Sequence, residues 1–115
     1  MIKIYGINNC DTIKKARKWL TAHNIEYQFY DFKKQALTSE KLDEWLTKTD
    51  WTVLLNKRGM MWRKLSDNEK AQMNLENARL TMLKTNSIIK RPILEFNEQL
   101  IIGFNETKYN TLFNE

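Results

Sequence analysis

The chain has 115 residues with one cysteine, one proline and three glycines, and its 19 basic against 14 acidic side chains give a net charge of +5. This length predicts a single domain with a real hydrophobic core, and 42% hydrophobic residues exclude extended disorder. One cysteine excludes an intramolecular disulfide, and neither a signal-peptide pattern nor an apolar run long enough for a membrane span occurs. We therefore expect a soluble, cytoplasmic protein that makes no membrane contact.

The positive charge is unevenly distributed. Residues 1–64 carry 13 basic and 7 acidic side chains, whereas residues 65–115 carry 6 and 7. This asymmetry predicts a basic face, which either attracts an anionic small molecule, nucleic acid or acidic partner or is simply solvated. Because no helix-turn-helix, RNA-recognition or zinc-finger pattern is present, nucleic acid is not an expected partner.

The first half of the chain alternates between strand and helix patterns. Residues 1–5 predict a short apolar strand, and residues 11–23 carry apolar side chains at helical spacing. Aromatic and β-branched residues predict a second strand over 25–32, and a second helix is predicted from position 38 or 39 to about 48. Two parallel strands joined by a helix are typical of a right-handed crossover connection.

The second half begins with helical patterns and ends with a hairpin. A helical turn is predicted over 51–55, and a capping-box pattern begins one continuous helix over about 66–84. Two short strands over 93–96 and 100–103 are separated by a hairpin-sized gap, and a closing helix is predicted over 105–115. The order β-α-β-α, helical insert, β-β-α predicts an α/β thioredoxin-like fold with a mixed four-stranded sheet.

Cys10 lies between the first predicted strand and the first predicted helix. Backbone N–H groups and the helix dipole at such a position favour an anion, and therefore the thiolate, which is the nucleophilic form of cysteine. The alternative is a small buried hydrophobic residue. Ile13 stands where a C-x-x-C motif would carry its second cysteine, so a mixed disulfide formed at Cys10 needs an external thiol for its resolution.

Residues beside the cysteine are candidates for binding a substrate. Asn9 and Thr12 can donate hydrogen bonds near the sulfur, although Thr12 serves equally well as an ordinary residue at a helix N-terminus. Pro92, the only proline, follows a basic residue and begins a strand, where either a cis or a trans peptide bond fits. His23, the only histidine, has no cysteine–histidine cluster near it, so neither a metal site nor a bound cofactor is expected.

Three groups of residues form an ordered set of motifs along nearly the whole chain. They are YGINNCDTIKKA at 5–16, LLNKRG at 54–59 with WRKL at 62–65, and IKRPIL at 89–94 with GF at 103–104. Together they resemble the arsenate reductase (ArsC)/Spx family, and more narrowly its YffB-type branch. The resemblance implies one thioredoxin-like domain of this type over residues 1–115, with a helical insertion at about 50–86.

The resemblance also implies a thiol-based reductase that works with glutathione as a co-substrate. Arg58 and Arg91 match two arginines that hold an oxyanion near the cysteine in arsenate reductases, a task suited to a permanently charged bidentate donor. The matching proline in thioredoxin-like proteins follows a cis peptide bond and faces the active cysteine, which implies the same for Pro92 and Cys10. Two solvated surface arginines are the alternative for Arg58 and Arg91.

Two departures from the family pattern narrow this function. Residues 100–104 contain no arginine or lysine where arsenate reductases carry a third arginine, so arsenate is expected to be a poor substrate. Ile13 removes the C-x-x-C redox switch of Spx-type regulators. We therefore expect a monothiol, glutathione-dependent reductase with Cys10, Arg58 and Arg91 as catalytic residues, acting on glutathione and a small thiol or disulfide. The alternatives are an Spx-like regulator that binds RNA polymerase and a weak arsenate reductase.

Overall fold

The structure is a computed structural model that describes residues 1–113. The chain forms two compact units, of which the first combines residues 1–34 with the chain from Arg91 onward and the second comprises residues 35–90. The second unit contains the insertion predicted at about 50–86, and the single-domain organisation stays a prediction. Among the described residues, no helix is both long and apolar enough to cross a lipid bilayer.

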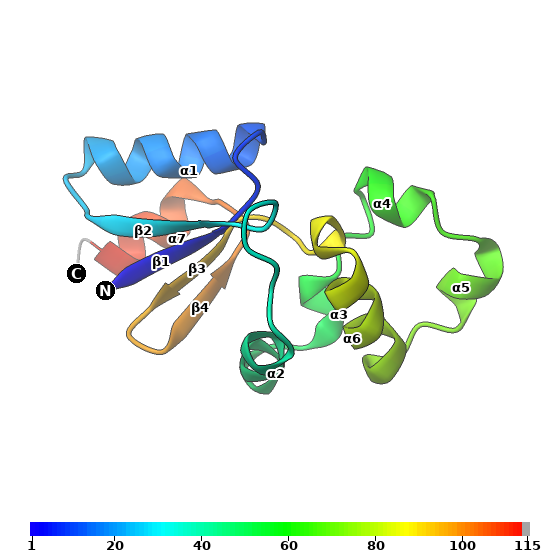
Figure 1. Cartoon of the computed structure of the whole chain (residues 1–115). Helices are drawn as coiled ribbons and strands as arrows, with labels where there is room; N and C mark the ends of the chain where they lie inside the picture. The colour runs from blue at the N-terminus through cyan, green and yellow to red at the C-terminus, as the bar shows by residue number, and fades with distance from the viewer. Residues whose placement is uncertain (114–115) are drawn as a thin grey trace. The chain divides into compact units, whose positions relative to one another are not determined.

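The first unit is built on a mixed four-stranded sheet of order β2-β1-β3-β4, labelled in Figure 1. β1 pairs in parallel with β2 and antiparallel with β3, and β3 pairs antiparallel with β4. This topology confirms the predicted α/β thioredoxin-like fold and its mixed sheet. The strands are β1 (Ile2–Gly6), β2 (Tyr27–Asp31), β3 (Ile93–Phe96) and β4 (Gln99–Ile102).

The terminal hairpin is tighter than its sequence predicts. Asn97 and Glu98 have φ angles of 49° and 65°, which is the left-handed conformation that a two-residue hairpin turn requires. Phe96 therefore pairs with Gln99, and β4 begins and ends one residue earlier than predicted.

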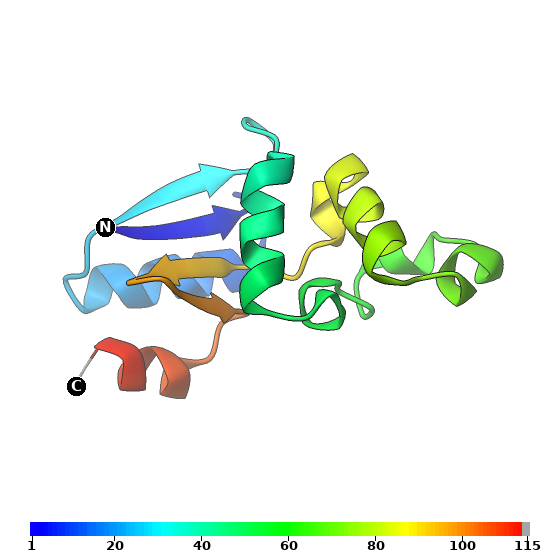
Figure 2. The same ribbon diagram turned by 90° about the horizontal axis from the view of Figure 1, so that it is seen from below.

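Two helices cover one face of this sheet, α1 (Asp11–Ala22) and α7 (Glu106–Phe113). Figure 1 shows both on the same side of the strands, and Figure 2 shows α1 behind them. The rings of Trp19 and Tyr109 meet edge to face, with centroids 5.4 Å apart, and this contact joins the two helices. The predicted helix over 105–115 is confirmed over the described part, and residues 114–115 lie outside the described residues.

The core of the first unit follows from the spacing of its apolar residues. Side chains three or four positions apart in α1 lie on one helical face, and those of alternate residues in β1 lie on one face of the sheet. Both faces bury their apolar groups against Tyr109 of α7. The buried residues of this cluster are Ile2, Ile4, Ala16, Trp19, Leu20, Leu94 and Tyr109.

The second unit is helical. Within it, Leu55 and Ile89 form an isolated antiparallel β-bridge. Its elements are α2 (Ser39–Lys48), α3 (Trp51–Leu54), α4 (Met60–Arg63), α5 (Asp67–Ala71), α6 (Leu75–Lys84) and the 3-10 helix η1 (Asn86–Ile88).

The prediction of one continuous helix over 66–84 is wrong. The capping box of Ser66 and Glu69 is present, but α5 ends at Ala71. Asn74 then starts a new helix, because its side-chain oxygen accepts a hydrogen bond from the Asn77 N–H at 2.8 Å. An asparagine side chain that bonds to the backbone in this way favours a helix start over a helix interior.

Candidate active site

Cys10 lies at the junction of β1 and α1, as its sequence position predicts. It is the N-cap of α1, with extended backbone angles of φ −145° and ψ 127°, and its carbonyl oxygen accepts a hydrogen bond from the Lys14 N–H at 3.0 Å. The thiol is free and partly exposed, which excludes a fully buried structural cysteine. Because the Cys10 side chain makes no capping hydrogen bond, N–H groups in the first turn of α1 remain available to a thiolate or an anionic ligand.

Pro92 and Arg91 come from the strand that pairs with β1. The Arg91–Pro92 peptide bond is cis, which confirms the conformation implied by the resemblance. Tyr5 is paired with Ile93 in the antiparallel register, and one further step along that register brings Gly6 opposite Pro92. The cis peptide therefore lies at the same end of the sheet as the loop that leads from β1 to Cys10.

Gly6 explains how closely these segments approach one another. A Cβ atom at Gly6 would run into the Ile13 side chain, with Cγ1 at 2.9 Å, and would lie 3.9 Å from the Cβ of Arg91. The absence of a side chain at Gly6 thus allows the first turn of α1 to pack against the end of β1, next to Arg91. In this way the first unit gathers Cys10, Arg91 and Pro92 at one end of its sheet.

Arg91 is available to a substrate anion. Its side chain is half-buried, and within residues 1–113 its guanidinium makes no hydrogen bond or ion pair. Asn9 is exposed and Thr12 is half-buried, and their side chains are likewise without a hydrogen-bond partner in that part of the chain. Their roles in binding substrate stay predictions, and so does the catalytic role of Arg91.

Arg58 belongs to the second unit, in the turn between α3 and α4. The side-chain oxygen of Asn56 accepts a hydrogen bond from the Arg58 N–H at 3.1 Å, and the Asn56 N–H donates to the Ile88 carbonyl oxygen at 2.9 Å. These bonds hold the turn against the segment that precedes Lys90. The Arg58 side chain is exposed, and its partnership with Cys10 and Arg91 stays a prediction.

Arg17 is a positioning residue that the sequence did not identify. Its Nη1 donates to the side-chain oxygen of Asn8 at 3.2 Å, and its Nε donates to the Tyr27 hydroxyl at 3.0 Å. Its guanidinium carbon also lies 4.4 Å from the ring centroid of Phe29. Arg17 thus ties the loop before Cys10 to β2, and the available signal was a charged residue on the apolar face of the first predicted helix.

We also searched the described residues for side chains that could hold a metal ion. Within residues 1–113, no cluster of three or more histidine, cysteine, aspartate or glutamate side chains is arranged to do so. The groups gathered at the end of the sheet are a free thiol, a helix N-terminus and the Arg91 guanidinium.

The chain resembles known proteins in both sequence and fold. The model of the ArsC family matches residues 5–112. The solved structure of the YffB protein superposes with a TM-score of 0.92 at 38% identity, covering 96% of this chain and 97% of that one. The solution structure of an arsenate reductase (ArsC) related protein from Brucella melitensis gives 0.81 at 43% identity, covering 99% and 95%. The global transcriptional regulator Spx 1 of Lactococcus lactis is 31% identical over 92% of this chain and 84% of its own length.

Proposed function

Because the chain belongs to the ArsC family, we propose that it is a glutathione-dependent thiol reductase with Cys10 as its nucleophile. One observation carries the proposal: a free, partly exposed cysteine caps α1 at the end of the sheet where the cis Arg91–Pro92 peptide lies. The proposal includes a cytoplasmic location, where glutathione keeps thiols reduced.

The reaction takes place in two thiol–disulfide exchanges. The Cys10 thiolate attacks the glutathione sulfur of a mixed disulfide, the S–S bond breaks, and the substrate leaves as a thiolate that takes up a proton. The thiolate of a second glutathione then attacks the glutathione sulfur bound to Cys10, which releases oxidised glutathione and restores the Cys10 thiolate. One substrate disulfide is reduced, and two glutathione units end as one disulfide. Since the chain has a single cysteine, the second thiol must come from outside.

The neighbouring residues bind and orient the glutathione unit in this proposal. Arg91 and Arg58 neutralise its carboxylates beside the thiolate, and Asn9 and Thr12 donate hydrogen bonds to the bound disulfide. Pro92 shapes the wall that faces the sulfur. Arsenate is a poor substrate in this scheme, because residues 100–104 offer no cation for the third side of an oxyanion.

Incubation with oxidised glutathione followed by intact mass measurement tests the proposal directly. We expect one glutathione adduct per chain, none on Cys10→Ser, and a lower yield on Arg91→Ala or Arg58→Ala. Glutathione-dependent reduction of a small mixed disulfide should be lost in Cys10→Ser. Full activity in that variant, or no adduct at any pH, contradicts the proposal.

A second candidate function is favoured by the similarity to Spx 1 of Lactococcus lactis. In this alternative the chain is a regulatory protein that binds RNA polymerase, and Cys10 is not needed for the binding. Retention of RNA polymerase by both the natural protein and Cys10→Ser, together with absence of thiol transfer, would favour the alternative.

A further inference from the structure

A groove runs along the helical face of the first unit, between α1 and the chain that enters α7. Its volume is about 820 Å³, and its lining includes Thr12, Lys15, Lys18, Trp19 and His23 on one side and Phe104 on the other. All of these residues belong to the first unit. The groove therefore lies on the same helix whose N-cap is Cys10.

The groove is long. Thr12 and His23 mark the two ends of its wall along α1, and at 1.5 Å per helical residue they are about 16 Å apart. An extended polypeptide advances about 3.3 Å per residue, so the wall matches about five residues. One end, at Thr12, is two residues from Cys10. Cys10 itself does not line the groove, so a ligand that fills it has one end near the first turn of α1 and the other at the far end of that helix.

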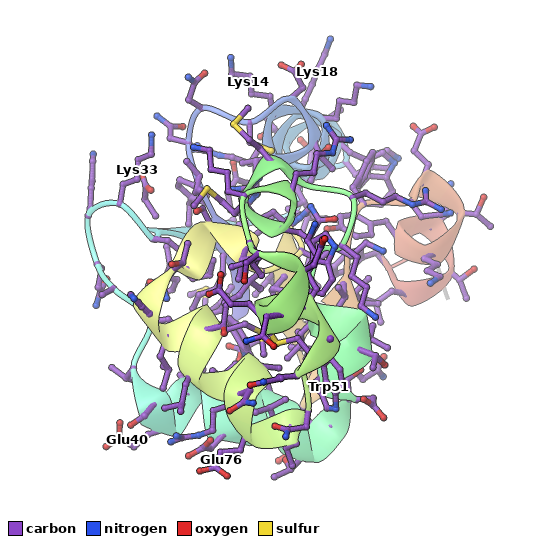
Figure 3. All side chains as sticks on the ribbon, turned by 90° about the vertical axis from the view of Figure 1, so that its right-hand side faces the viewer. Lys14, Lys18, Lys33, Glu40, Trp51 and Glu76 are labelled. Carbon is purple, nitrogen blue, oxygen red and sulfur yellow. The ribbon has the colours of Figure 1, made fainter. Side chains whose placement is uncertain are left out.

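The chemistry of the groove is cationic at its rim and apolar at its base. Lys15 and Lys18 are exposed and line it, and Lys14 is exposed on the same helix. Figure 3 shows Lys14 and Lys18 extending outward from α1. Within residues 1–113, none of these three lysines has an ion-pair partner. Glu106 is the one acidic side chain among the described residues of the lining.

The aromatic residues of the groove are not arranged to stack on bases. Trp19 is only 6% exposed, and the His23 ring covers it at a centroid distance of 3.8 Å. Phe104 packs edge to face on Tyr109, with ring centroids 4.9 Å apart. Single-stranded nucleic acid is bound by free aromatic faces, which these contacts remove. Phe104 is half-buried and is the aromatic ring that offers apolar surface to a ligand side chain.

We propose that this groove binds the polypeptide of a protein substrate, as an extended segment of about five residues that is acidic and carries apolar side chains. The proposal rests on the proposed function, since the segment flanks the glutathionylated cysteine that Cys10 reduces. Cys10 attacks the glutathione sulfur, the docked polypeptide leaves as a thiolate that takes up a proton, and external glutathione resolves the Cys10 mixed disulfide. Charge complementarity with Lys15 and Lys18 selects the segment, and the half-buried Phe104 contacts its apolar side chains.

Turnover of three glutathionylated substrates tests the docking. They are an acidic peptide with leucines, the same peptide with lysines replacing its acidic residues, and the mixed disulfide of cysteine and glutathione. In the double variant Lys15→Glu, Lys18→Glu, we expect the KM for the acidic peptide to rise about tenfold or more, since two attractive charges become repulsive. Its activity on cysteine–glutathione disulfide should stay within about twofold of the natural protein.

The control is the double variant Lys33→Glu, Lys34→Glu, which changes the net charge equally. Both lysines follow β2 in the first unit and do not line the groove, and Figure 3 shows Lys33 on that loop. We expect the control to handle all three substrates like the natural protein. An equal rise in KM in both double variants, or equal turnover of acidic and basic peptides by the natural protein, would overturn the docking site.

Binding to Cys10→Ser separates this inference from the proposed function. A fluorescent acidic peptide should bind that variant, and the Lys15→Glu, Lys18→Glu changes should weaken its binding. If the peptide binds in this way while the natural protein transfers no thiol, the groove stands and the proposed function fails. If the natural protein turns over the small disulfide but the lysine changes do not affect peptide binding, the proposed function stands and the docking site fails. Displacement of the peptide by single-stranded DNA at an equal affinity would also overturn the assignment to a polypeptide.

Discussion

In the first unit, side chains far apart in the sequence meet through strand register, whereas the helices of the second unit mostly begin at a side-chain cap two or three residues away. Ile4 pairs with Phe29 on one side and with Leu94 on the other, so one strand fixes segments from both halves of the chain. The same register brings Pro92 next to Gly6. The geometry around Cys10 therefore depends on the sheet.

In the second unit, strand pairing is limited to the isolated bridge between Leu55 and Ile89 among the described residues. The caps are local: Thr38 accepts from the Lys41 N–H, Asp50 from Thr52, Ser66 from Glu69 and Asn74 from Asn77. Leucines on α6 are exposed by 54% and 53%, at Leu75 and Leu80. Both units bury apolar side chains, including Leu42, Trp45 and Met82 in the second. The contrast teaches that the geometry around Cys10 should respond to packing at the sheet, whereas the helix starts of the second unit should respond to the loss of a cap.

Alanine substitution at one glycine of each unit, Gly6 in the first and Gly59 in the second, should test this contrast most clearly. Gly6→Ala places a methyl group against Ile13, and such overpacking lowers the free energy of unfolding by about 1–3 kcal/mol. At Gly59 the nearest atom to a new Cβ is Asn56 Nδ2, at 2.8 Å, the far end of a side chain that can move at the cost of its hydrogen bond from the Arg58 N–H. We expect Gly59→Ala to cost about 1 kcal/mol or less, measured by urea denaturation.

The cause of the Gly6→Ala effect can be isolated by shortening its neighbour. If the methyl group clashes with Ile13, adding Ile13→Val should cost less in the Gly6→Ala background than in the natural protein. Additive costs would show that the methyl group is accommodated elsewhere, and equal costs at Gly6 and Gly59 would remove the contrast between the units.

Asn74→Ala tests the cap that divides α5 from α6. Loss of an N-cap lowers the free energy of unfolding by about 1 kcal/mol, and the amide protons of α6 should exchange faster with solvent. If residues 66–84 formed one continuous helix, the same change would instead stabilise it, because alanine has the higher helix propensity. The sign of the change in urea denaturation therefore separates the two arrangements.

The control for this cap is Asn68→Ala in α5. The Asn68 side chain accepts a hydrogen bond from Gln72 at 3.2 Å on the helix surface, and we expect its loss to cost about 0.5 kcal/mol or less. A comparable loss at Asn68 and Asn74 would argue against a specific capping role.

Most of the fold could be predicted because its signals are local and repeated. The apolar spacing of α1 and the runs of apolar, aromatic and β-branched residues in the first two strands each extend over several residues, so these elements are predicted from the sequence. The break at Asn74 was missed because asparagine fits both a helix interior and a cap, and only the backbone decides between them. α4 was missed because four residues are too few to show a helical period.

Some features of the candidate site could likewise be predicted from the sequence, whereas others depend on the folded sheet. The position of Cys10 follows from the predicted strand and helix beside it, whereas the cis bond before Pro92 is implied only by the family resemblance. The hydrogen bonds of Arg17 to Asn8 and Tyr27 exist only because β2 lies beside β1, and the spacing of α1 does not reveal them. The groove has walls from α1 and from the approach to α7, segments that only the folded sheet brings together.

Of these substitutions, Tyr109→Phe should change the free energy of unfolding least at neutral pH. It tests whether the Tyr109 hydroxyl has a partner in the core of the first unit. The Tyr109 hydroxyl is fully buried and, among the described residues, has no hydrogen-bond partner. Removing an unpartnered buried hydroxyl leaves the ring contacts with Trp19 and Phe104 in place. We expect the free energy of unfolding at pH 7 to stay the same or rise by up to about 1 kcal/mol.

The same variant should reveal its effect at alkaline pH. Burial raises the pKa of Tyr109 well above its ordinary value of 10, so the folded protein keeps the phenol neutral while the unfolded chain ionises it. The stability of the natural protein is therefore lost progressively as pH rises past about 10, whereas Tyr109→Phe lacks this contribution. Urea denaturation at pH 7 and pH 11 measures the free energy of unfolding of both proteins.

Tyr30→Phe is the control, because the Tyr30 hydroxyl is exposed and donates to Gln28 at 3.1 Å. A loss of more than about 1 kcal/mol in Tyr109→Phe at pH 7 would mean that the hydroxyl has a partner in the core.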